Sequence, residues 1–129
     1  MSQKILLVDD EPLNLDLLEQ ELGELGYAVA KAEGGRAALD MLATVSPDLI
    51  LLDYQMPGMN GFEVLDRLAQ SPVTQRLPVI IFTVKQLTVE DKQRLQGRAA
   101  WLAQKDVCSG KEVATMVQAA LQRTLGERG

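Results

Sequence analysis

Short apolar runs alternate with longer amphipathic segments along the whole chain. Residues 4–8, 48–52 and 78–82 read KILLV, DLILL and PVIIF, nearly continuous apolar runs that are typical of strands buried on both faces of a parallel sheet. Residues 27–32 and 99–104 alternate apolar and polar positions more evenly, which predicts edge strands. The pattern as a whole predicts an α/β fold in which five strands and five helices alternate and helices cover both faces of the sheet.

The segments between these runs carry apolar residues at helical spacing. Pro12 is well placed for a first helical turn and Gly26 for a helix stop, and the second helix ends before Ser46. The third helix begins at residues 60–63, and a capping box over residues 109–112 opens the last one. The residues predicted to face the core are Leu15, Leu18, Leu22 and Leu25 in the first helix, Ala38, Met41, Leu42 and Val45 in the second, Phe62, Leu65 and Ala69 in the third, and Val113, Met116, Val117, Ala120, Leu121 and Thr124 in the last.

Residues 88–97 make the weakest of the predicted helices. Thr88 and Asp91 can cap it, but only Val89 and Leu95 are clearly apolar, whereas the residues between 90 and 94 all carry charged or amide side chains. A helix here buries little apolar surface, so we expect it to be among the less stable elements.

Composition narrows the classes of function. A chain of 129 residues fits one domain with a real core, and its net charge of −5 speaks against a general nucleic-acid interface and favours cations as partners. No run is long enough for a membrane span and the N-terminus does not read as a signal peptide, so we expect a cytoplasmic protein. The single cysteine, Cys108, excludes an internal disulfide, and the absence of histidine excludes chemistry that needs the chain's own imidazole.

Chemically active side chains follow the predicted strands at their carboxyl ends. In an open parallel sheet these ends share one rim, and functional groups collect there. The residues in question are Asp9, Asp10 and Glu11 after the first strand, Asp53 after the third, Thr83 after the fourth and Lys105 after the fifth.

Three aspartates at one rim repel one another unless a cation compensates their charge. Mg²⁺ binds carboxylate oxygens and completes its coordination with water and phosphate oxygens, so the cluster predicts a magnesium site. One aspartate beside bound phosphate can act as a nucleophile and form an aspartyl phosphate. The ion and Lys105 would neutralise charge on the transferring group, and Thr83 could hydrogen-bond its oxygens.

Taken together, the motifs resemble the receiver domain of the two-component response regulators. The resemblance runs from ILLVDDEP (5–12) through DLILLDYQMPGMNGFEVL (48–65) and PVIIFT (78–83) to Lys105 and the last helix. It implies a flavodoxin-like (βα)5 fold, a five-stranded parallel sheet of order 2-1-3-4-5. The chain is then expected to be one receiver domain, residues 1–129, with a sheet core at about 4–105, a last helix at about 109–125 and no output domain.

The resemblance also implies roles for individual residues. Asp53 would be the phospho-acceptor and would bind Mg²⁺ directly together with Asp10, while Asp9 would act through water. The backbone carbonyl of Gln55 would be a further metal ligand. Thr83 would be the switch hydroxyl and Lys105 the lysine that pairs with the phosphate. Gly58 and Gly61 are expected to serve backbone geometry, with positive φ as one option.

The function implied is a phospho-accepting signalling switch of a phosphorelay. The donor would be a histidine on a separate sensor histidine kinase or phosphotransfer protein, which accounts for the lack of histidine in this chain. The domain would catalyse its own aspartyl phosphorylation and dephosphorylation without turning over a free substrate. Phosphorylation would change the face formed by the fourth helix, fifth strand and fifth helix, which contacts a downstream protein or effector domain and also allows a homodimer. Neither nucleic acid nor membrane is an expected partner.

Three positions depart from the family pattern. Val84 stands where the family has a small residue, Leu102 where it has an aromatic one, and Asp106 where it has a proline after the lysine. The missing proline and the missing aromatic residue keep a second reading open, a receiver-like interaction module that works without phosphorylation. A phosphatase with an aspartate nucleophile fits less well, because VDDEP lacks the Asp-x-Asp of that class. A dinucleotide binder also fits poorly, because no G-x-G-x-x-G motif follows the first strand.

Overall fold

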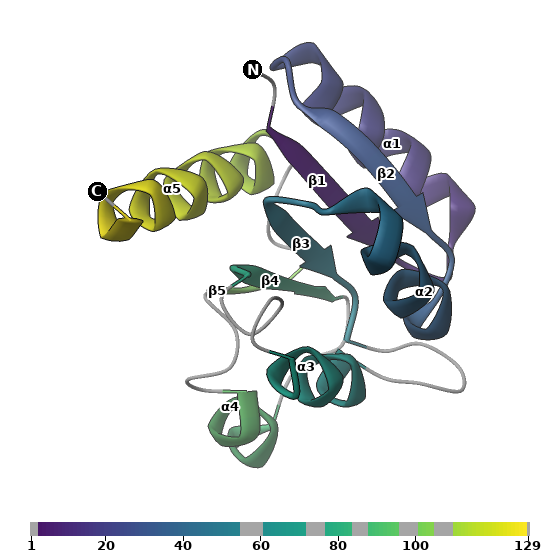
Figure 1. The fold of residues 1–129 in the computed structure, drawn as a ribbon, viewed down its shortest axis with the longest axis vertical. Coiled ribbons are helices and arrows are strands. Elements are labelled where there is room, and N and C mark those ends of the chain that lie inside the picture. The colour runs from purple at the N-terminus through teal and green to yellow at the C-terminus, as the bar shows by residue number, and fades with distance from the viewer. Residues whose placement is uncertain are drawn as a thin grey trace.

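The fold is an alternation of strands and helices from one end of the chain to the other (Figure 1). The computed structural model describes residues 3–54, 61–71, 77–83, 88–95, 101–104 and 110–128. The elements are β1 (Lys4–Val8), α1 (Pro12–Glu24), β2 (Ala28–Ala32), α2 (Gly35–Val45), β3 (Leu49–Leu52), α3 (Gly61–Ala69), β4 (Val79–Thr83), α4 (Val89–Leu95), β5 (Trp101–Gln104) and α5 (Gly110–Arg128).

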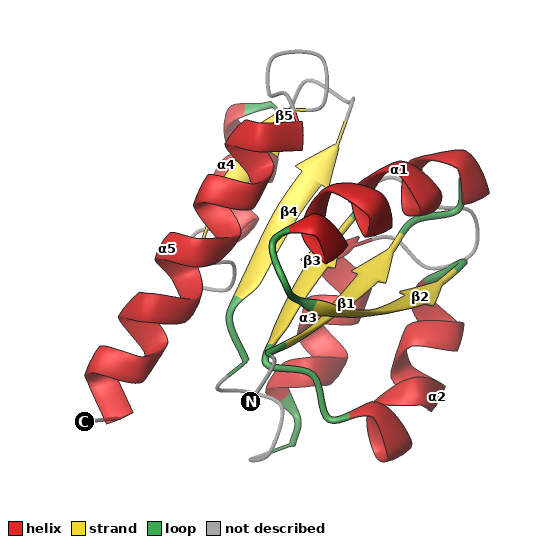
Figure 2. Ribbon diagram, turned by 90° about the horizontal axis from the view of Figure 1, so that it is seen from above, coloured by secondary structure: helices red, strands yellow, loops and turns green. Residues whose placement is uncertain are grey.

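The strands form a parallel sheet. Strands β2, β1, β3 and β4 pair in that order, which confirms this part of the predicted topology, and the backbone of β5 runs parallel beside β4. In Figure 2 the arrows of the sheet point toward the same rim and fan out with its twist. Chain order reverses between β1 and β3, because β1 is followed by β2 on one side of the sheet and by β3 on the other. The carboxyl ends at such a reversal are the usual place for a ligand.

Two apolar layers sandwich the sheet, one on each face. Alternate residues of β1 explain the division, because Ile5 and Leu7 pack on one side and Leu6 and Val8 on the other. The first layer contains side chains of α1 and α5, and the second contains side chains of α2 and α3. Every residue of β3 is buried, as the continuous run predicted.

Two predicted core residues are wrong. Leu25 lies just past the end of α1 and is 58% exposed, because the chain turns there through Gly26, whose φ is +92°. Ala69 in α3 is also exposed. The buried stripe of α3 is displaced by one residue from the predicted one and consists of Gly61, Val64, Leu65 and Leu68.

The polar helix α4 forms where it was predicted, and its cap is the predicted one. Thr88 Oγ1 accepts a hydrogen bond from the Asp91 N–H at 3.0 Å, and an Asp91 carboxylate oxygen accepts one from the Thr88 N–H at 3.2 Å. Val89 is 72% exposed. Among the side chains described from 88 to 93, Asp91 is the one that is half-buried, so this part of the helix contributes little to the core.

The helix α5 spans 19 residues and is the longest in the described ranges. Its inner face presents buried Val113, Val117 and Leu121, as the sequence predicted. Ser109, the first residue of the predicted capping box, lies outside the described residues. No helix in the described part of the chain is long and apolar enough to cross a membrane.

Candidate functional site

Asp9 and Asp53 are placed side by side by the backbone of the two central strands. Val8 is paired with Leu52 in the parallel register, so the next residue of each strand is an aspartate. The Asp53 N–H donates to the Val8 carbonyl at 2.9 Å, and the Asp9 N–H donates to the Ala32 carbonyl of β2 at 3.1 Å. Both aspartates are therefore held by the sheet, although they lie just beyond the strand ends.

Three carboxylates meet at this rim. One carboxylate oxygen from each of Asp9, Asp10 and Asp53 lies within 4.8 Å of the others. Asp9 is 3% exposed and Asp53 is 6% exposed, whereas Asp10 is open to solvent. Three negative charges this close repel one another, and the oxygen donor set is one that a hard divalent cation prefers. The predicted carboxylate cluster is thus assembled, and its residues suit Mg²⁺.

The orientation of Asp9 is fixed by two contacts on the N-terminal side of α1. The Glu11 backbone N–H donates to Asp9 Oδ1 at 3.0 Å, and Asn14 Nδ2 lies 3.5 Å from Asp9 Oδ2. The first of these is the turn that an aspartate side chain commonly makes with the backbone two residues on. Asn14 was not among the predicted site residues, although its place in the first turn of the helix after the acidic pair is a signal for such a contact.

Tyr54 and Gly61 are in close contact directly after Asp53. The Gly61 N–H donates to the Tyr54 carbonyl at 2.8 Å. A Cβ added at Gly61 would lie 2.8 Å from the Tyr54 Cα and 3.2 Å from the Asp53 carbonyl oxygen. Glycine is therefore required here by close packing, and the glycine with positive φ in the described residues is Gly26.

The remaining predicted site residues are placed only in part. The backbone of Thr83 ends β4 and is paired with Gln104, so it reaches the rim, but its side chain is not described. Gln55 and Lys105 lie outside the described residues, as do Val84 and Asp106. The geometry thus joins Asp9, Asp10 and Asp53 and leaves the other expected roles as predictions.

A family model for the response regulator receiver domain matches residues 5–118. This chain belongs to that family. Receiver domains of two-component systems are phosphorylation-dependent signalling switches, and their family typically binds Mg²⁺ at an acidic pocket. The fold and the aspartate cluster described above agree with this assignment.

Individual proteins with similar sequences include a response regulator, in agreement with the family assignment. The receiver is 47% identical over 83 residues to the response regulator PleD of Caulobacter vibrioides, a stretch that covers 64% of this chain and 18% of PleD. It is 39% identical over 82 residues to protein PilH of Pseudomonas aeruginosa, covering 64% of this chain and 68% of PilH. The matched stretch is therefore less than a fifth of the length of PleD.

Among solved structures, the receiver is similar to the signal receiver domain of a putative Luxo repressor protein from Vibrio parahaemolyticus. That comparison has a TM-score of 0.89 at 28% identity and covers 99% of this chain and 96% of the other. The agreement extends over the whole fold.

Proposed function

We propose that this receiver accepts a phosphoryl group on Asp53 and that the modification changes its affinity for a partner protein. The observation that carries the proposal is the cluster of Asp9, Asp10 and Asp53, with one oxygen of each within 4.8 Å of the others. Asp53 follows the central strand β3, and its backbone is fixed to β1, so its carboxylate is presented at the rim in a defined position. Such preorganisation favours phosphoryl transfer, which depends mainly on positioning and charge stabilisation.

The proposed transfer starts from a phosphohistidine on a partner. A carboxylate oxygen of Asp53 attacks the phosphorus, a P–O bond forms and the P–N bond breaks. The electron pair of that bond stays on the imidazole nitrogen, which takes up a proton. Mg²⁺ bound at the rim would supply charge neutralisation for the phosphoryl oxygens. The chain needs no histidine for this reaction, in agreement with its composition.

The three aspartates differ in ways that support different roles. Both oxygens of Asp9 face protein donors, the Glu11 N–H and the Asn14 amide, which suits contact with a metal through water. Asp10 is exposed and suits direct coordination, shared with Asp53 and the carbonyl of Gln55. Thr83 and Lys105 complete the proposal, as the hydroxyl and the ammonium that contact the phosphoryl oxygens.

The proposal extends to the rest of the fold and to partners. We infer that β5 completes the sheet in the order 2-1-3-4-5, supported by its backbone register with β4, and that residues 1–129 act as one receiver domain. Receiver domains interact with sensor histidine kinases and downstream effectors. We propose that the donor is a cytoplasmic kinase or phosphotransfer protein. The α4–β5–α5 face would contact an effector or a second copy of the chain, and the domain would catalyse its own dephosphorylation.

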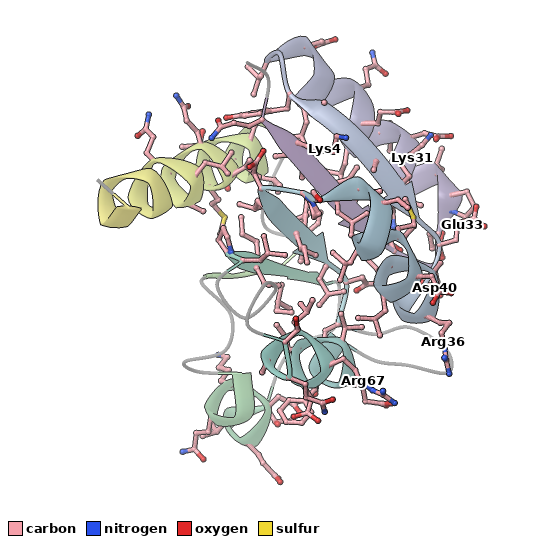
Figure 3. All side chains as sticks on the ribbon, in the orientation of Figure 1. Lys4, Lys31, Glu33, Arg36, Asp40 and Arg67 are labelled. Carbon is pink, nitrogen blue, oxygen red and sulfur yellow. The ribbon has the colours of Figure 1, made fainter. Side chains whose placement is uncertain are left out.

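Phosphate trapping on Asp53 tests the proposal directly. The protein is incubated with Mg²⁺ and acetyl phosphate, and intact-mass and peptide mass spectrometry follow the added phosphoryl group. We expect incorporation in the wild type and in Asp40→Asn, since Asp40 is an exposed carboxylate on α2 (Figure 3), and none in Asp53→Asn. Omission of Mg²⁺ should also suppress incorporation. An unmodified Asp53 under these conditions, and with a cognate kinase, contradicts the proposal.

Partner binding separates the proposal from the phosphorylation-independent module. If phosphorylation controls the partner face, an Asp53→Ala variant should no longer change its partner affinity when the donor is added. A variant that binds and signals like the wild type would favour the alternative.

A further inference from the structure

Tyr54 joins the acceptor site to a helix far along the chain. Its side chain is only 5% exposed and belongs to the apolar layer under α2 and α3. Its hydroxyl nevertheless donates a hydrogen bond to Asp91 Oδ1 in the first turn of α4, at 3.3 Å. A buried tyrosine commonly finds a polar partner for its hydroxyl, and here that partner belongs to the helix whose first-turn apolar residue, Val89, is exposed.

The same carboxylate also caps the helix. Asp91 Oδ2 accepts the Thr88 N–H, so its two oxygens join the helix cap to the tyrosine. Val89, the apolar residue of the first turn, is 72% exposed and cannot hold α4 against the sheet. The Tyr54–Asp91 hydrogen bond is thus a specific connection between the end of β3 and the first turn of α4, the helix at the bottom of Figure 1.

Tyr54 is also built to pass on a displacement. It directly follows Asp53, its carbonyl accepts the Gly61 N–H, and its backbone lies so close to Gly61 that an added Cβ there would be 2.8 Å from the Tyr54 Cα. Because the tyrosine ring is rigid and buried, it moves together with its backbone. A backbone displacement at Asp53 would therefore displace the Tyr54 hydroxyl. Phosphorylation of Asp53 would replace a carboxylate of charge −1 by an acyl phosphate of about −2, and the added charge of about −1 would repel the Asp91 carboxylate and attract the hydroxyl proton.

We propose that the Tyr54–Asp91 hydrogen bond couples the Asp53 site to α4, and that phosphorylation of Asp53 weakens this bond and loosens the helix. The inference rests on the proposed function, which it deepens by naming a route from the site to the partner face. Because the coupling is a difference between two states, it is measurable as the response of α4 to phosphorylation.

Hydrogen exchange of the α4 amides tests this coupling in two steps. In the unmodified protein, Tyr54→Phe keeps the ring and removes the donor, and we expect α4 to exchange about fivefold faster, as loss of one ordinary hydrogen bond predicts. In the wild type, Mg²⁺ with acetyl phosphate should raise α4 exchange by a similar factor. Tyr54→Phe should take up phosphate normally, and its α4 exchange should then no longer respond.

Thr88→Ala is the matched control, because it loosens α4 through the cap and leaves the Tyr54–Asp91 contact in place. Its α4 amides should exchange faster from the start and still respond to phosphorylation. Amides of α1 report whether each variant is folded, and Tyr54→Leu, which also lacks the hydroxyl and leaves the Asp91 cap in place, replaces Tyr54→Phe if that variant is not.

Three results would overturn the inference: unchanged α4 exchange in unmodified Tyr54→Phe, no response of α4 in the phosphorylated wild type, or a wild-type response in phosphorylated Tyr54→Phe. If mass spectrometry shows that Asp53 takes up no phosphate, the proposed function fails and the coupling with it. The comparison in unmodified protein still decides whether the hydrogen bond holds α4.

Discussion

The central strands β1 and β3 are held in place mainly by buried apolar contacts, whereas the first turn of the helix α4 is held mainly by hydrogen bonds. Every residue of β3 is buried, and both strands are covered by apolar layers on two faces. They are also tied at their start, where the Lys4 N–H donates to Asp48 Oδ2 at 2.8 Å and the Asp48 N–H donates to the Lys4 carbonyl at 2.7 Å. The helix α4, in contrast, exposes Val89 and depends on the polar contacts of Asp91.

The carboxylate site and the proposed output face therefore belong to parts of the receiver that differ in stability. Carboxylates that must meet within a few ångströms of one another are attached to the elements with the most buried surface. The helix of the proposed output face is attached by hydrogen bonds that contribute about 1 kcal/mol each, so a modest change can shift it. Elements that move in signalling are generally drawn from the less stable parts of a fold.

The largest expected effect comes from a cavity in the central strands. Ile50→Ala removes a side chain that is 1% exposed and should lower the free energy of unfolding by about 2 to 5 kcal/mol. Val89→Ala, the matched change on α4, should stay within about 0.5 kcal/mol of the wild type. Urea unfolding measures both. Equal losses in the two variants would show that α4 is packed as firmly as the sheet.

A smaller loss is expected where the segment after β3 meets α3. Gly61→Ala places a Cβ 2.8 Å from the Tyr54 Cα, and the backbone must shift, which should destabilise the fold by about 1 to 3 kcal/mol. Gly23→Ala is the control, because a Cβ there meets nothing within 4 Å and alanine favours a helix by about 1 kcal/mol. Unfolding midpoints of the two variants should therefore move in opposite directions. A neutral Gly61→Ala would show that the close approach costs nothing.

Removal of a charge from the aspartate cluster should change the stability in the opposite direction from removal of a core side chain. Asp10→Asn removes one of three mutually repelling carboxylates and should raise the stability of the metal-free protein by about 1 kcal/mol or less. The same change should reduce the stabilisation gained on adding Mg²⁺, since binding to the folded state is what produces that gain. Thermal unfolding across a Mg²⁺ titration measures both effects. Asp40→Asn should behave like the wild type, and a similar response in both variants would argue against a rim site.

The sequence predicts the strands and the acidic rim well because both depend on local pattern. A strand buried on both faces must be apolar throughout, and a polar residue directly after it falls at the sheet's rim. The rotation of a helix is decided by packing instead, which is why Ala69 was wrongly assigned to the core and Val64 was passed over. The sequence also does not reveal that Tyr54 reaches Asp91, 37 residues away, because nothing local to either residue names its partner.

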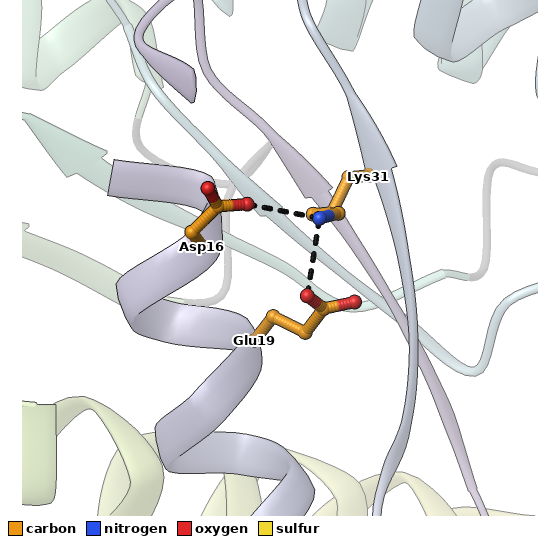
Figure 4. A network of polar contacts seen from close by, with 3 residues as sticks. All are labelled: Asp16, Glu19 and Lys31. Atoms are coloured by element: carbon orange, nitrogen blue, oxygen red, sulfur yellow. Dashed lines mark hydrogen bonds and ion pairs between the residues drawn. The ribbon is translucent and has the colours of Figure 1, made fainter. Parts of the chain in front are cut away.

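The smallest effect is expected at Lys31. It tests whether an exposed polar contact can hold a helix in place as the Tyr54–Asp91 contact is proposed to do. Lys31 Nζ lies 2.9 Å from Asp16 Oδ1 and 3.0 Å from Glu19 Oε1, between β2 and α1 (Figure 4). Hydrogen bonds to Asp16 and Glu19 raise the pKa of Lys31 above its ordinary value of 10.5. Solvent reaches all three side chains, and exposed ion pairs contribute little.

Lys31→Gln should therefore barely move the urea midpoint at neutral pH. A raised pKa stabilises the folded state below the unfolded value of 10.5, and this contribution is lost as pH rises through the higher folded pKa. Any difference between the variant and the wild type should accordingly persist from neutral pH to about 10.5 and disappear as the pH rises through the higher folded pKa. Unfolding curves at neutral and strongly alkaline pH measure this difference. If Lys31→Gln loosened α1 as much as Tyr54→Phe is expected to loosen α4, burial of the tyrosine would not be what makes its hydrogen bond effective.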